Sequence, residues 1–263
     1  QVLPVAAEAV PAAGFTADPL DEAATLAAPG LLRKYSGRGL LLVAGGCAVN
    51  CRYCFRRAFP YAESGVSRAG MAAALEAIAA DESLIEVILS GGDPLLLDDE
   101  RFADIVRRLA SIAHVRRLRI HSRLPVVLPS RITDGLLDTL ATTRLTTVVV
   151  IHANHPHELD ESVALAVRKL TAARALLLNQ AVLLAGVNDT PATQRALAER
   201  LVEIGVVPYY LHQLDRVAGA AHFEVSDERA TALHRDLREA LPGYAVPRLV
   251  RARPGTRAKE WIL

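Results

Sequence analysis

The chain has 263 residues, of which 51% are hydrophobic and 22% are charged, and its formal net charge is +1. This composition is typical of an ordered enzyme, and it argues against intrinsic disorder and against a surface that binds nucleic acid. The length fits one large domain, because α/β barrels reach this size. The longest apolar run, near Leu40–Val43, is too short to span a bilayer, so we expect no membrane association.

The amino-terminal stretch Val2–Ala28 is rich in Ala and Pro and shows little periodicity. We interpret residues 1–30 as an extended arm over the rest of the molecule; a flexible tail is the alternative. The chain starts at Gln1 and its only methionine is Met71. We therefore expect the gene product to contain further residues upstream.

Cys47, Cys51 and Cys54 follow the first apolar, β-rich run and are the only cysteines in the chain. Three thiolates on one short loop can hold three irons of a four-iron, four-sulfur (4Fe-4S) cluster, which leaves the fourth iron open for a ligand. The Cys-x3-Cys-x2-Cys spacing, with Tyr53 just before the last cysteine, resembles the signature of radical S-adenosylmethionine (radical SAM) enzymes.

Other interpretations of these cysteines are weaker. A disulfide framework usually has an even number of cysteines and occurs in small secreted chains. A structural zinc site needs four ligands, and the nearest histidines, His114 and His121, lie far along the chain. Unpaired thiols and an oxygen-sensitive cluster both fit the reducing cytoplasm, where we expect the protein to be.

Six apolar, β-rich runs alternate with helical patterns and, after the first run, recur about every 30 residues, the length of one β-α unit. In one helical pattern, Glu161–Arg174, Val163 begins an apolar stripe and Asp160 is placed to cap the helix. Six such units predict an α/β fold, a partial (β/α)6 TIM-like barrel over residues 31–240. The predicted strands are Leu40–Val43, Ile85–Leu89, Leu118–His121, Thr147–His152, Ala175–Leu184 and Val206–His212.

Polar residues recur at or near the ends of these strands, which is where barrel enzymes carry their active sites. The diglycine Gly91-Gly92 would let the backbone approach a ligand closely, with Asp93 accepting from an ammonium group, although the same residues also make a good turn. The polar groups are Ser90 to Asp93, His121 to Arg123, His152 with Asn154 and His155, Asn179 with Gln180, and His212 to Asp215.

Longer motifs carry a more specific resemblance over residues 29 to 259. They are Cys-Ala-Val-Asn-Cys-Arg-Tyr-Cys-Phe-Arg-Arg, Leu-Ser-Gly-Gly-Asp-Pro-Leu, Arg-Ile-His-Ser-Arg-Leu-Pro-Val-Val-Leu-Pro and Pro-Tyr-Tyr-Leu-His-Gln-Leu-Asp. Together they resemble the lysine 2,3-aminomutases, and most of all the branch that acts with bacterial elongation factor P (EF-P). Gly-Ala-Ala-His-Phe-Glu-Val-Ser-Asp, after the sixth predicted strand, strengthens the resemblance to that branch.

The resemblance implies an isomerase that converts L-lysine to β-lysine by a 2,3-amino shift. Its cofactors would be a 4Fe-4S cluster held by Cys47, Cys51 and Cys54, S-adenosyl-L-methionine (SAM) and pyridoxal 5′-phosphate (PLP). The implied partners are an electron donor of the flavodoxin or ferredoxin type, and EF-P with the ligase that attaches β-lysine to it. A homo-oligomer is possible.

PLP needs a lysine for its Schiff base, and the chain has three lysines. Lys169 lies on the polar face of a predicted helix, and Lys34 precedes the first strand. By resemblance, Lys259 falls at the family's PLP lysine, within a C-terminal segment that we assign to residues 241–263. The alternative for Lys259 is a solvated lysine near a frayed end.

The resemblance also assigns roles to other residues. Arg56 matches the arginine that pairs with the substrate carboxylate, and Asp215 matches an aspartate that binds the lysine side-chain ammonium. The free-lysine enzymes have a second aspartate where this chain has Ala252. Residues implied in the PLP phosphate region are Lys34, Tyr35 and Arg38; further implied SAM or PLP contacts are Gly91, Gly92, Asp93, Ser122, His152 and Gln180.

Three alternative functions stay open at this point. The first is a catabolic 2,3-aminomutase that acts on free lysine or another amino acid. The second is a radical SAM enzyme without PLP, suggested by the unusual tail Glu260–Leu263. The third is a non-enzymatic iron–sulfur or zinc protein.

Overall fold

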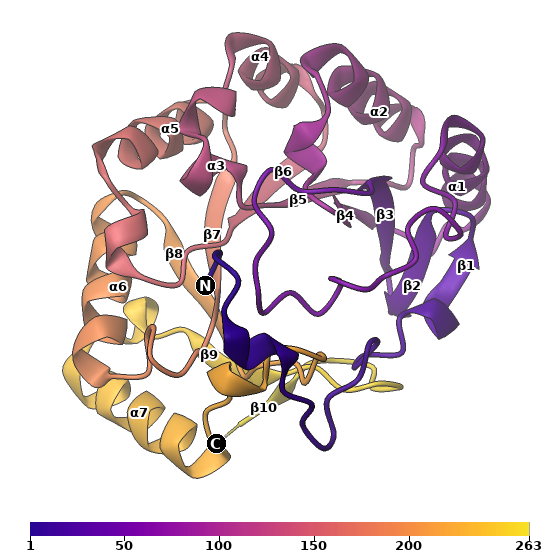
Figure 1. Ribbon diagram of the computed structural model, residues 1–263. Coiled ribbons are helices and arrows are strands. Elements are labelled where there is room, and N and C mark those ends of the chain that lie inside the picture. Colours follow the sequence, from indigo (N-terminus) through magenta and orange to yellow (C-terminus); the bar gives the residue numbers. More distant parts are fainter. Residues whose placement is uncertain (263) are drawn as a thin grey trace.

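The computed structural model describes residues 1–262, so Leu263, the last residue of the predicted C-terminal segment, lies outside the described part. Within it the strands form one sheet, paired in chain order and curled into a ring (Figure 1). The strands are β1 (Leu26–Ala28), β2 (Leu31–Tyr35), β3 (Arg38–Ala44), β4 (Glu86–Gly91), β5 (Arg117–Ser122), β6 (Thr146–Ile151), β7 (Leu176–Val182), β8 (Val207–His212), β9 (Arg248–Arg251) and β10 (Glu260–Trp261).

The six predicted strands correspond to β3 through β8, and all neighbouring pairs among them are parallel, as predicted. Strand β9 adds a further parallel strand beside β8, which the sequence did not predict. Strands β1, β2 and β10 are antiparallel to their neighbours at the two edges of the sheet. Since no pairing joins β1 to β10 in residues 1–262, the barrel is open, which confirms the partial barrel.

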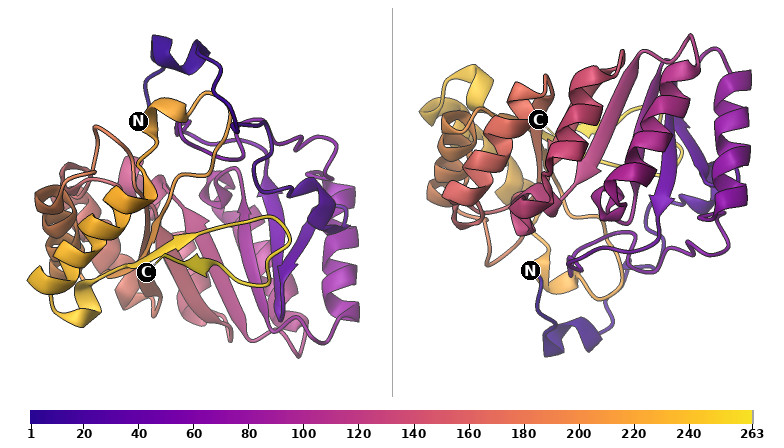
Figure 2. Two further views of the ribbon diagram at one scale, coloured as in Figure 1. Left: turned by 90° about the horizontal axis from the view of Figure 1, so that it is seen from below. Right: turned by 90° about the horizontal axis from the view of Figure 1, so that it is seen from above.

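Helices cover the outer face of the sheet (Figures 1 and 2). The α-helices are α1 (Arg68–Ala80), α2 (Asp99–Ser111), α3 (Leu124–Val127), α4 (Asp134–Thr142), α5 (Glu161–Ala172), α6 (Pro191–Glu203) and α7 (Asp227–Ala240). Short 3-10 helices are η1 (Ala6–Ala9), η2 (Ala23–Thr25), η3 (Pro94–Leu96), η4 (Pro129–Arg131), η5 (Pro156–Glu158), η6 (Ala221–Phe223) and η7 (Gly243–Ala245).

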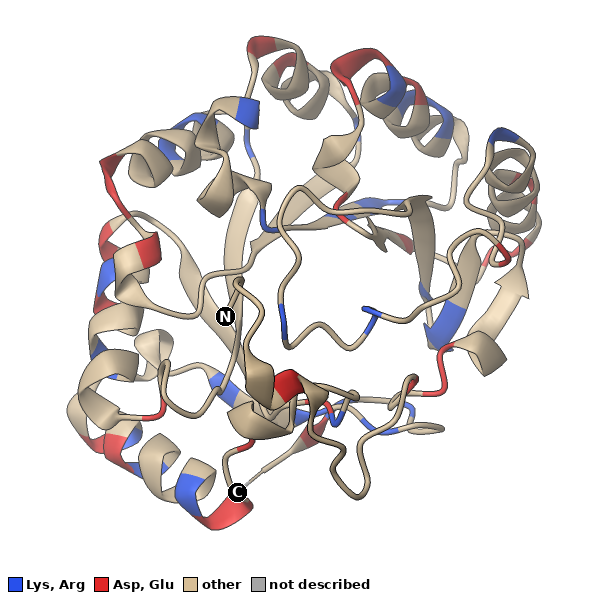
Figure 3. Ribbon diagram, in the orientation of Figure 1, with Lys and Arg blue, Asp and Glu red and all other residues tan. Residues whose placement is uncertain are grey.

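The helices begin where the sequence provides a cap. A Ser, Thr or Asp side chain accepts a backbone N–H in the first turn of α1, α2, α4, α5, α6 and α7, and each such cap contributes about 1 kcal/mol. The predicted cap Asp160 is confirmed at α5. Basic and acidic residues are interspersed along the outer helices (Figure 3), in keeping with the small net charge.

The apolar core lies between the sheet and the helices. Along the central strands one set of alternating residues, including Leu41, Leu89 and Ile120, is fully buried in this layer, and each such side chain contributes about 1.5–3 kcal/mol. The alternate set faces the barrel interior and mixes polar with apolar residues: Ser90, Arg119, His121, His152, Gln180, Tyr210 and His212 line a cavity there beside Leu40, Ile88 and Val182. The barrel interior therefore holds a cavity with several polar groups and is not a packed apolar core.

The amino-terminal arm crosses the carboxyl ends of the strands and lies beside the loop that carries the cysteines (Figure 2). Thr16 forms a parallel bridge with Val217, and Glu8 of η1 forms ion pairs with Arg52 and Arg57 of the cysteine loop. These contacts hold the arm against the barrel. Among the described residues, no helix combines the length and apolar character needed to cross a membrane.

Candidate active site

One cavity of about 340 Å³ occupies the barrel interior and brings nearly all of the predicted site residues together. It extends from the β2–β3 turn to the cysteine loop and is closed on one side by the C-terminal segment. The predicted residues that line it are Lys34, Tyr35, Arg38, Cys47, Cys51, Cys54, Arg56, Gly91, Gly92, Asp93, His152, Gln180, Asp215 and Lys259.

The cysteine loop runs from the end of β3 to the start of α1 and is held by close backbone packing against the end of β4. A Cβ on Gly92 would lie 1.9 Å from the carbonyl oxygen of Gly46, and one on Gly91 would lie 2.5 Å from that of Ala44. The backbone at Gly91 is also in a left-handed region (φ +116°). The diglycine therefore serves first to let β4 approach the cysteine loop, whereas the sequence interpretation assigned that close approach to a ligand.

The three thiols line the cavity at this end; Cys47 is exposed, and Cys51 and Cys54 are half-buried. In residues 1–262, no three His, Cys, Asp or Glu side chains converge on one point as they would for a single metal ion. In a 4Fe-4S cluster each thiolate binds a different iron, so three separate thiols on one loop fit that donor set. Each thiol has to lose its proton before it binds iron, so assembly of the cluster would release protons.

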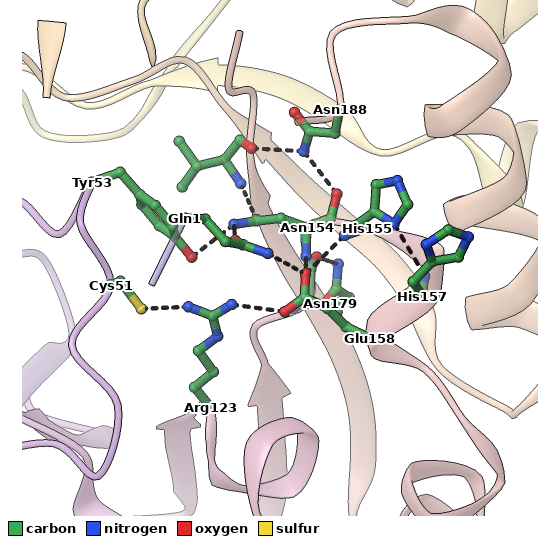
Figure 4. A network of polar contacts seen from close by, with 12 residues as sticks. Gln1, Cys51, Tyr53, Arg123, Asn154, His155, His157, Glu158, Asn179 and Asn188 are labelled. Atoms are coloured by element: carbon green, nitrogen blue, oxygen red, sulfur yellow. Dashed lines mark hydrogen bonds and ion pairs between the residues drawn. The ribbon is translucent and has the colours of Figure 1, made fainter. Parts of the chain in front are cut away.

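Arg123, which directly follows β5, connects the cysteine loop to η5 (Figure 4). Its Nη1 donates to Cys51 Sγ at 2.7 Å and its Nη2 donates to Glu158 Oε2 at 2.7 Å. On the same side, Asn154 Nδ2 donates to the hydroxyl of Tyr53 at 2.7 Å. The guanidinium thus places a positive charge beside a cysteine sulfur, and its own position is fixed by an ion pair.

Asp93 has a structural environment that the sequence did not anticipate. Its Oδ1 accepts from Leu95 N and Ser122 Oγ, and its Oδ2 accepts from the backbone N–H groups of Arg123 and Leu124. These four protein donors occupy the carboxylate, so it joins the ends of β4 and β5 rather than awaiting an ammonium. Ser122 is fully buried behind Asp93 and does not line the cavity, contrary to its expected contact with SAM or PLP.

Arg56 is buried in the cavity wall and is already paired. Its Nε and Nη2 donate to the two carboxylate oxygens of Glu22 at 2.5 and 2.9 Å, and its Nη1 donates to Ser90 Oγ at 2.9 Å. The sequence did not single out Glu22, which comes from the amino-terminal arm. No periodicity marks it, because its partner lies 34 residues further along the chain.

Lys259 and Asp215 lie in the same cavity, opposite in charge. Burial lowers the pKa of Lys259 to about 8, an effect partly opposed by Asp215. Burial raises the pKa of Asp215 to about 6, an effect partly opposed by Lys259 and Lys34. A lysine with a lowered pKa is a nucleophilic amine near neutral pH, which is what Schiff-base chemistry requires.

Basic and aromatic residues gather at the other end of the cavity, near the amino ends of the strands. The guanidinium of Arg38 lies 5.2 Å from the centre of the Tyr35 ring, and the amine of Lys34 lies 5.8 Å from it. Arg119, which the sequence interpretation left out, lines the same region. The alternation Arg117, Arg119, His121 on β5 was the signal that one face of this strand is polar.

Two buried imidazoles in the cavity have a free nitrogen. Nε2 of His152 and Nε2 of His212 have no hydrogen-bond partner among the described residues. Burial lowers the pKa of His152 to about 4 and that of His212 well below its usual value, so both rings are neutral near pH 7. Buried polar atoms rarely lack partners, so these nitrogens indicate a polar ligand in the cavity.

The cavity carries an excess of positive charge. Six cationic side chains line it, namely Lys34, Arg38, Arg56, Arg119, Arg123 and Lys259. Arg56, Arg119 and Arg123 are each paired with a glutamate, which leaves Lys34, Arg38 and Lys259 against Asp93 and Asp215. An interior with this balance favours ligands with negative groups, such as phosphates and carboxylates. The donor set therefore fits PLP and an amino acid together with the cluster.

An open α/β barrel with three cysteines on the loop after its first parallel strand defines a class of enzyme. Residues 41–190, which hold the cysteine loop and strands β4 to β7, match the Radical SAM superfamily. Similar solved structures agree on the fold. A radical SAM methyltransferase from Sphaerobacter thermophilus has a TM-score of 0.54 at 20% identity and covers 84% of this chain and 68% of its own. A spore photoproduct lyase variant has a TM-score of 0.52 at 16% identity, and the match covers 79% of this chain and 74% of the lyase. The protein is a radical SAM enzyme.

Its relatives narrow this class further. An L-lysine 2,3-aminomutase of Haemophilus influenzae is 50% identical over 244 residues, which cover 93% of this chain and 72% of the relative. That of Escherichia coli K12 is 49% identical over 259 residues, which cover 98% of this chain and 75% of the relative. That of Buchnera aphidicola is 44% identical over 262 residues, covering 100% and 77%. The chain belongs to the L-lysine 2,3-aminomutase family of isomerases, which confirms the family that the motifs predicted.

Proposed function

We propose that this enzyme converts L-lysine to β-lysine by moving the amino group from C2 to C3, with PLP as well as the cluster and SAM. The observation that carries the proposal is the presence, in one cavity, of three cysteines and a half-buried lysine whose pKa is lowered to about 8. The names of the relatives supply lysine as the substrate. When bound, the cluster and SAM would supply radical chemistry, and PLP would lower the barrier to migration of the amino group.

Cys47, Cys51 and Cys54 are proposed to hold three irons of the cluster at the carboxyl end of the barrel. Their thiols lie on one loop, and the packing of Gly92 against Gly46 fixes that loop to β4. This position faces into the polar cavity, so that an open iron would be directed toward the ligands there. The neighbouring diglycine, His152 and Gln180 form the wall against which we place SAM.

Lys259 is proposed as the residue that holds PLP. Lys259 directly precedes β10, and the pairing of β10 with β9 keeps it in place. Its amine lies 5.7 Å from the centre of the Tyr210 ring. The phosphate would then lie among Lys34, Tyr35 and Arg38, where the cavity is most basic. Lys169, in contrast, is exposed on α5, as the sequence predicted.

The substrate is proposed to span the cavity between Arg56 and Asp215. A guanidinium binds a carboxylate through two parallel hydrogen bonds, and a buried carboxylate binds an ammonium. Ala252, which takes the place of the family's second aspartate, is buried in the wall near this site and offers no acceptor. Asp215 therefore carries more of the selection for the side-chain ammonium than in enzymes with two aspartates.

The cellular role is proposed from the resemblance to the EF-P branch. In that role the product would be supplied to the ligase that attaches β-lysine to EF-P, in the cytoplasm, and a flavodoxin or ferredoxin would deliver the electron. We propose residues 1–30 as the arm, 31–240 as the barrel and 241–263 as the PLP segment, with β1 joining the arm and β9 joining the PLP segment to the barrel sheet.

An anaerobic assay tests the proposed activity. Reconstituted protein is incubated with reductant, SAM, PLP and L-lysine, and β-lysine is measured by mass spectrometry. We expect β-lysine only when both SAM and PLP are present. SAM cleavage without β-lysine would show another radical SAM reaction, and β-lysine without PLP would remove Lys259 from its proposed role. Deletion of the gene, followed by intact-mass analysis of EF-P, distinguishes EF-P modification from lysine catabolism.

A further inference from the structure

Glu22 is held in the cavity wall by its own local structure. Its backbone N–H donates to Asp18 Oδ1 at 3.1 Å, and its carbonyl accepts from the hydroxyl of Thr25 at 2.8 Å and from the backbone N–H of Thr25 at 2.9 Å. This turn leads into η2 and fixes the backbone before the side chain is considered. Glu22 is 6% exposed, so its carboxylate is out of bulk water.

The carboxylate of Glu22 pairs with one edge of the Arg56 guanidinium. The two hydrogen bonds go to Nε and Nη2, the side-on edge of the guanidinium, and Ser90 accepts from Nη1. A guanidinium has five N–H donors, so one donor on Nη1 and one on Nη2 remain without an acceptor in residues 1–262. The remaining donor on Nη2 lies on the end-on edge, where it can bind a second carboxylate together with Nη1.

We propose that Glu22 is a positioning residue that fixes the plane of Arg56 so that its end-on edge is presented to the substrate carboxylate. The inference rests on the proposed binding of that carboxylate by Arg56. Glu22 neutralises a buried guanidinium that would otherwise be an uncompensated charge, and it immobilises a side chain with several rotatable bonds. The arm thus orients Arg56 before the substrate binds.

A carboxylate beside a carboxylate-binding site also repels the ligand, so the surroundings must offset it. Lys34, Arg38 and Lys259 lie in the same cavity as Glu22 and reduce the repulsion between the two carboxylates. The opposite role, in which Glu22 occupies the place of the substrate carboxylate and must leave it, predicts that KM for L-lysine falls when Glu22 is replaced.

The test compares Glu22→Gln and Glu22→Asp with a matched control, Glu8→Gln. Glu8 is another arm glutamate that pairs with arginines of the cysteine loop, but it does not line the cavity. For Glu22→Gln we expect KM for L-lysine to rise roughly tenfold or more, since hydrogen bonds to charged groups are lost, with a smaller change in kcat. Glu22→Asp restores part of the affinity, and Glu8→Gln leaves KM within about twofold.

A second readout separates positioning from simple support of the fold. The ratio of KM for L-lysinamide to KM for L-lysine measures how well Arg56 recognises the carboxylate, and it should fall toward one in Glu22→Gln only. A lower KM for L-lysine in Glu22→Gln overturns the inference in favour of a competing carboxylate. An unchanged KM and ratio, or equal effects in Glu22→Gln and Glu8→Gln, overturns it as well. Absence of β-lysine with the unmodified enzyme would instead refute the proposed function.

Discussion

The carboxylate of Asp215 and the amine of Lys259 act on each other across the cavity: each holds the other closer to its charged form. Burial raises the pKa of Asp215 and lowers that of Lys259, and their mutual attraction opposes both shifts, so that the pKa values are about 6 and about 8. Between these values the pair is ionised. Asp215 can therefore bind an ammonium in that range, while Lys259 becomes a free amine only toward its upper end.

The first prediction concerns the pH dependence of PLP binding. Because only the neutral amine reacts with PLP, the rate of loading should rise as the pH passes through about 8. Asp215→Asn removes a charge that raises the pKa of Lys259, so the loading profile should move to lower pH. Stopped-flow absorbance of apo protein mixed with PLP at a series of pH values measures this. The control is Glu260→Gln, an exposed carboxylate paired with Arg253, which should leave the profile in place. A profile that moves to higher pH in Asp215→Asn would contradict the coupling.

The second prediction concerns the identity of the PLP lysine. Lys259→Ala should abolish the attachment of PLP while iron content stays at the level of the unmodified enzyme, because the amine lies at the C-terminal segment and away from the cysteine loop. Borohydride reduction followed by peptide mass spectrometry locates the attachment. Lys169→Ala, on the exposed face of α5, serves as the control and should bind PLP normally. PLP fixed to Lys34 would refute the assignment.

Much of the fold could be predicted because it depends on local periodicity. The strands from Leu40–Val43 to Val206–His212 are short, apolar and evenly spaced, and each is the product of nearby residues. The sequence does not predict strand β9 because only its two central residues, Leu249 and Val250, are apolar, and it becomes a strand by pairing with β8. The antiparallel strand β10 depends in turn on β9, so no local pattern marks it either.

The site could be predicted only in part, for the same physical reason. The positions of the cysteines and of His152 follow from where strands end, and that of Gln180 from the alternation within β7, which periodicity reveals. The pairing of Arg56 with Glu22 and that of Arg123 with Cys51 join residues 34 and 72 positions apart, so they depend on the three-dimensional fold. The sequence predicts Asp93 as a ligand acceptor because its four donors come from η3, the end of β5 and the start of α3, which no motif shows.

The third prediction concerns Arg123 and the cluster. A positive charge 2.7 Å from Cys51 Sγ stabilises the reduced, more negative cluster, so Arg123→Gln should lower its reduction potential. Arg123→Lys keeps the charge and should lower the potential less. A redox titration followed by electron paramagnetic resonance measures the potential independently of turnover. Equal potentials in the unmodified enzyme and in Arg123→Gln would show that the contact with Cys51 has no electrostatic effect on the cluster.

The fourth prediction concerns the packing that holds the cysteine loop. In Gly92→Ala the new methyl group would lie 1.9 Å from the carbonyl oxygen of Gly46, which is backbone and cannot rotate away. We expect this strain to lower the free energy of unfolding by about 1–3 kcal/mol and to reduce the iron bound after reconstitution, because the loop must shift. Gly46→Ala is the matched control: a Cβ there meets nothing within 4 Å, so its effect should stay within about 0.5 kcal/mol. Urea unfolding of the apo protein and an iron assay measure the two effects. Full stability and full iron content in Gly92→Ala would show that the loop is not positioned by this contact, and the diglycine would then be left with its first interpretation, the close approach of a ligand.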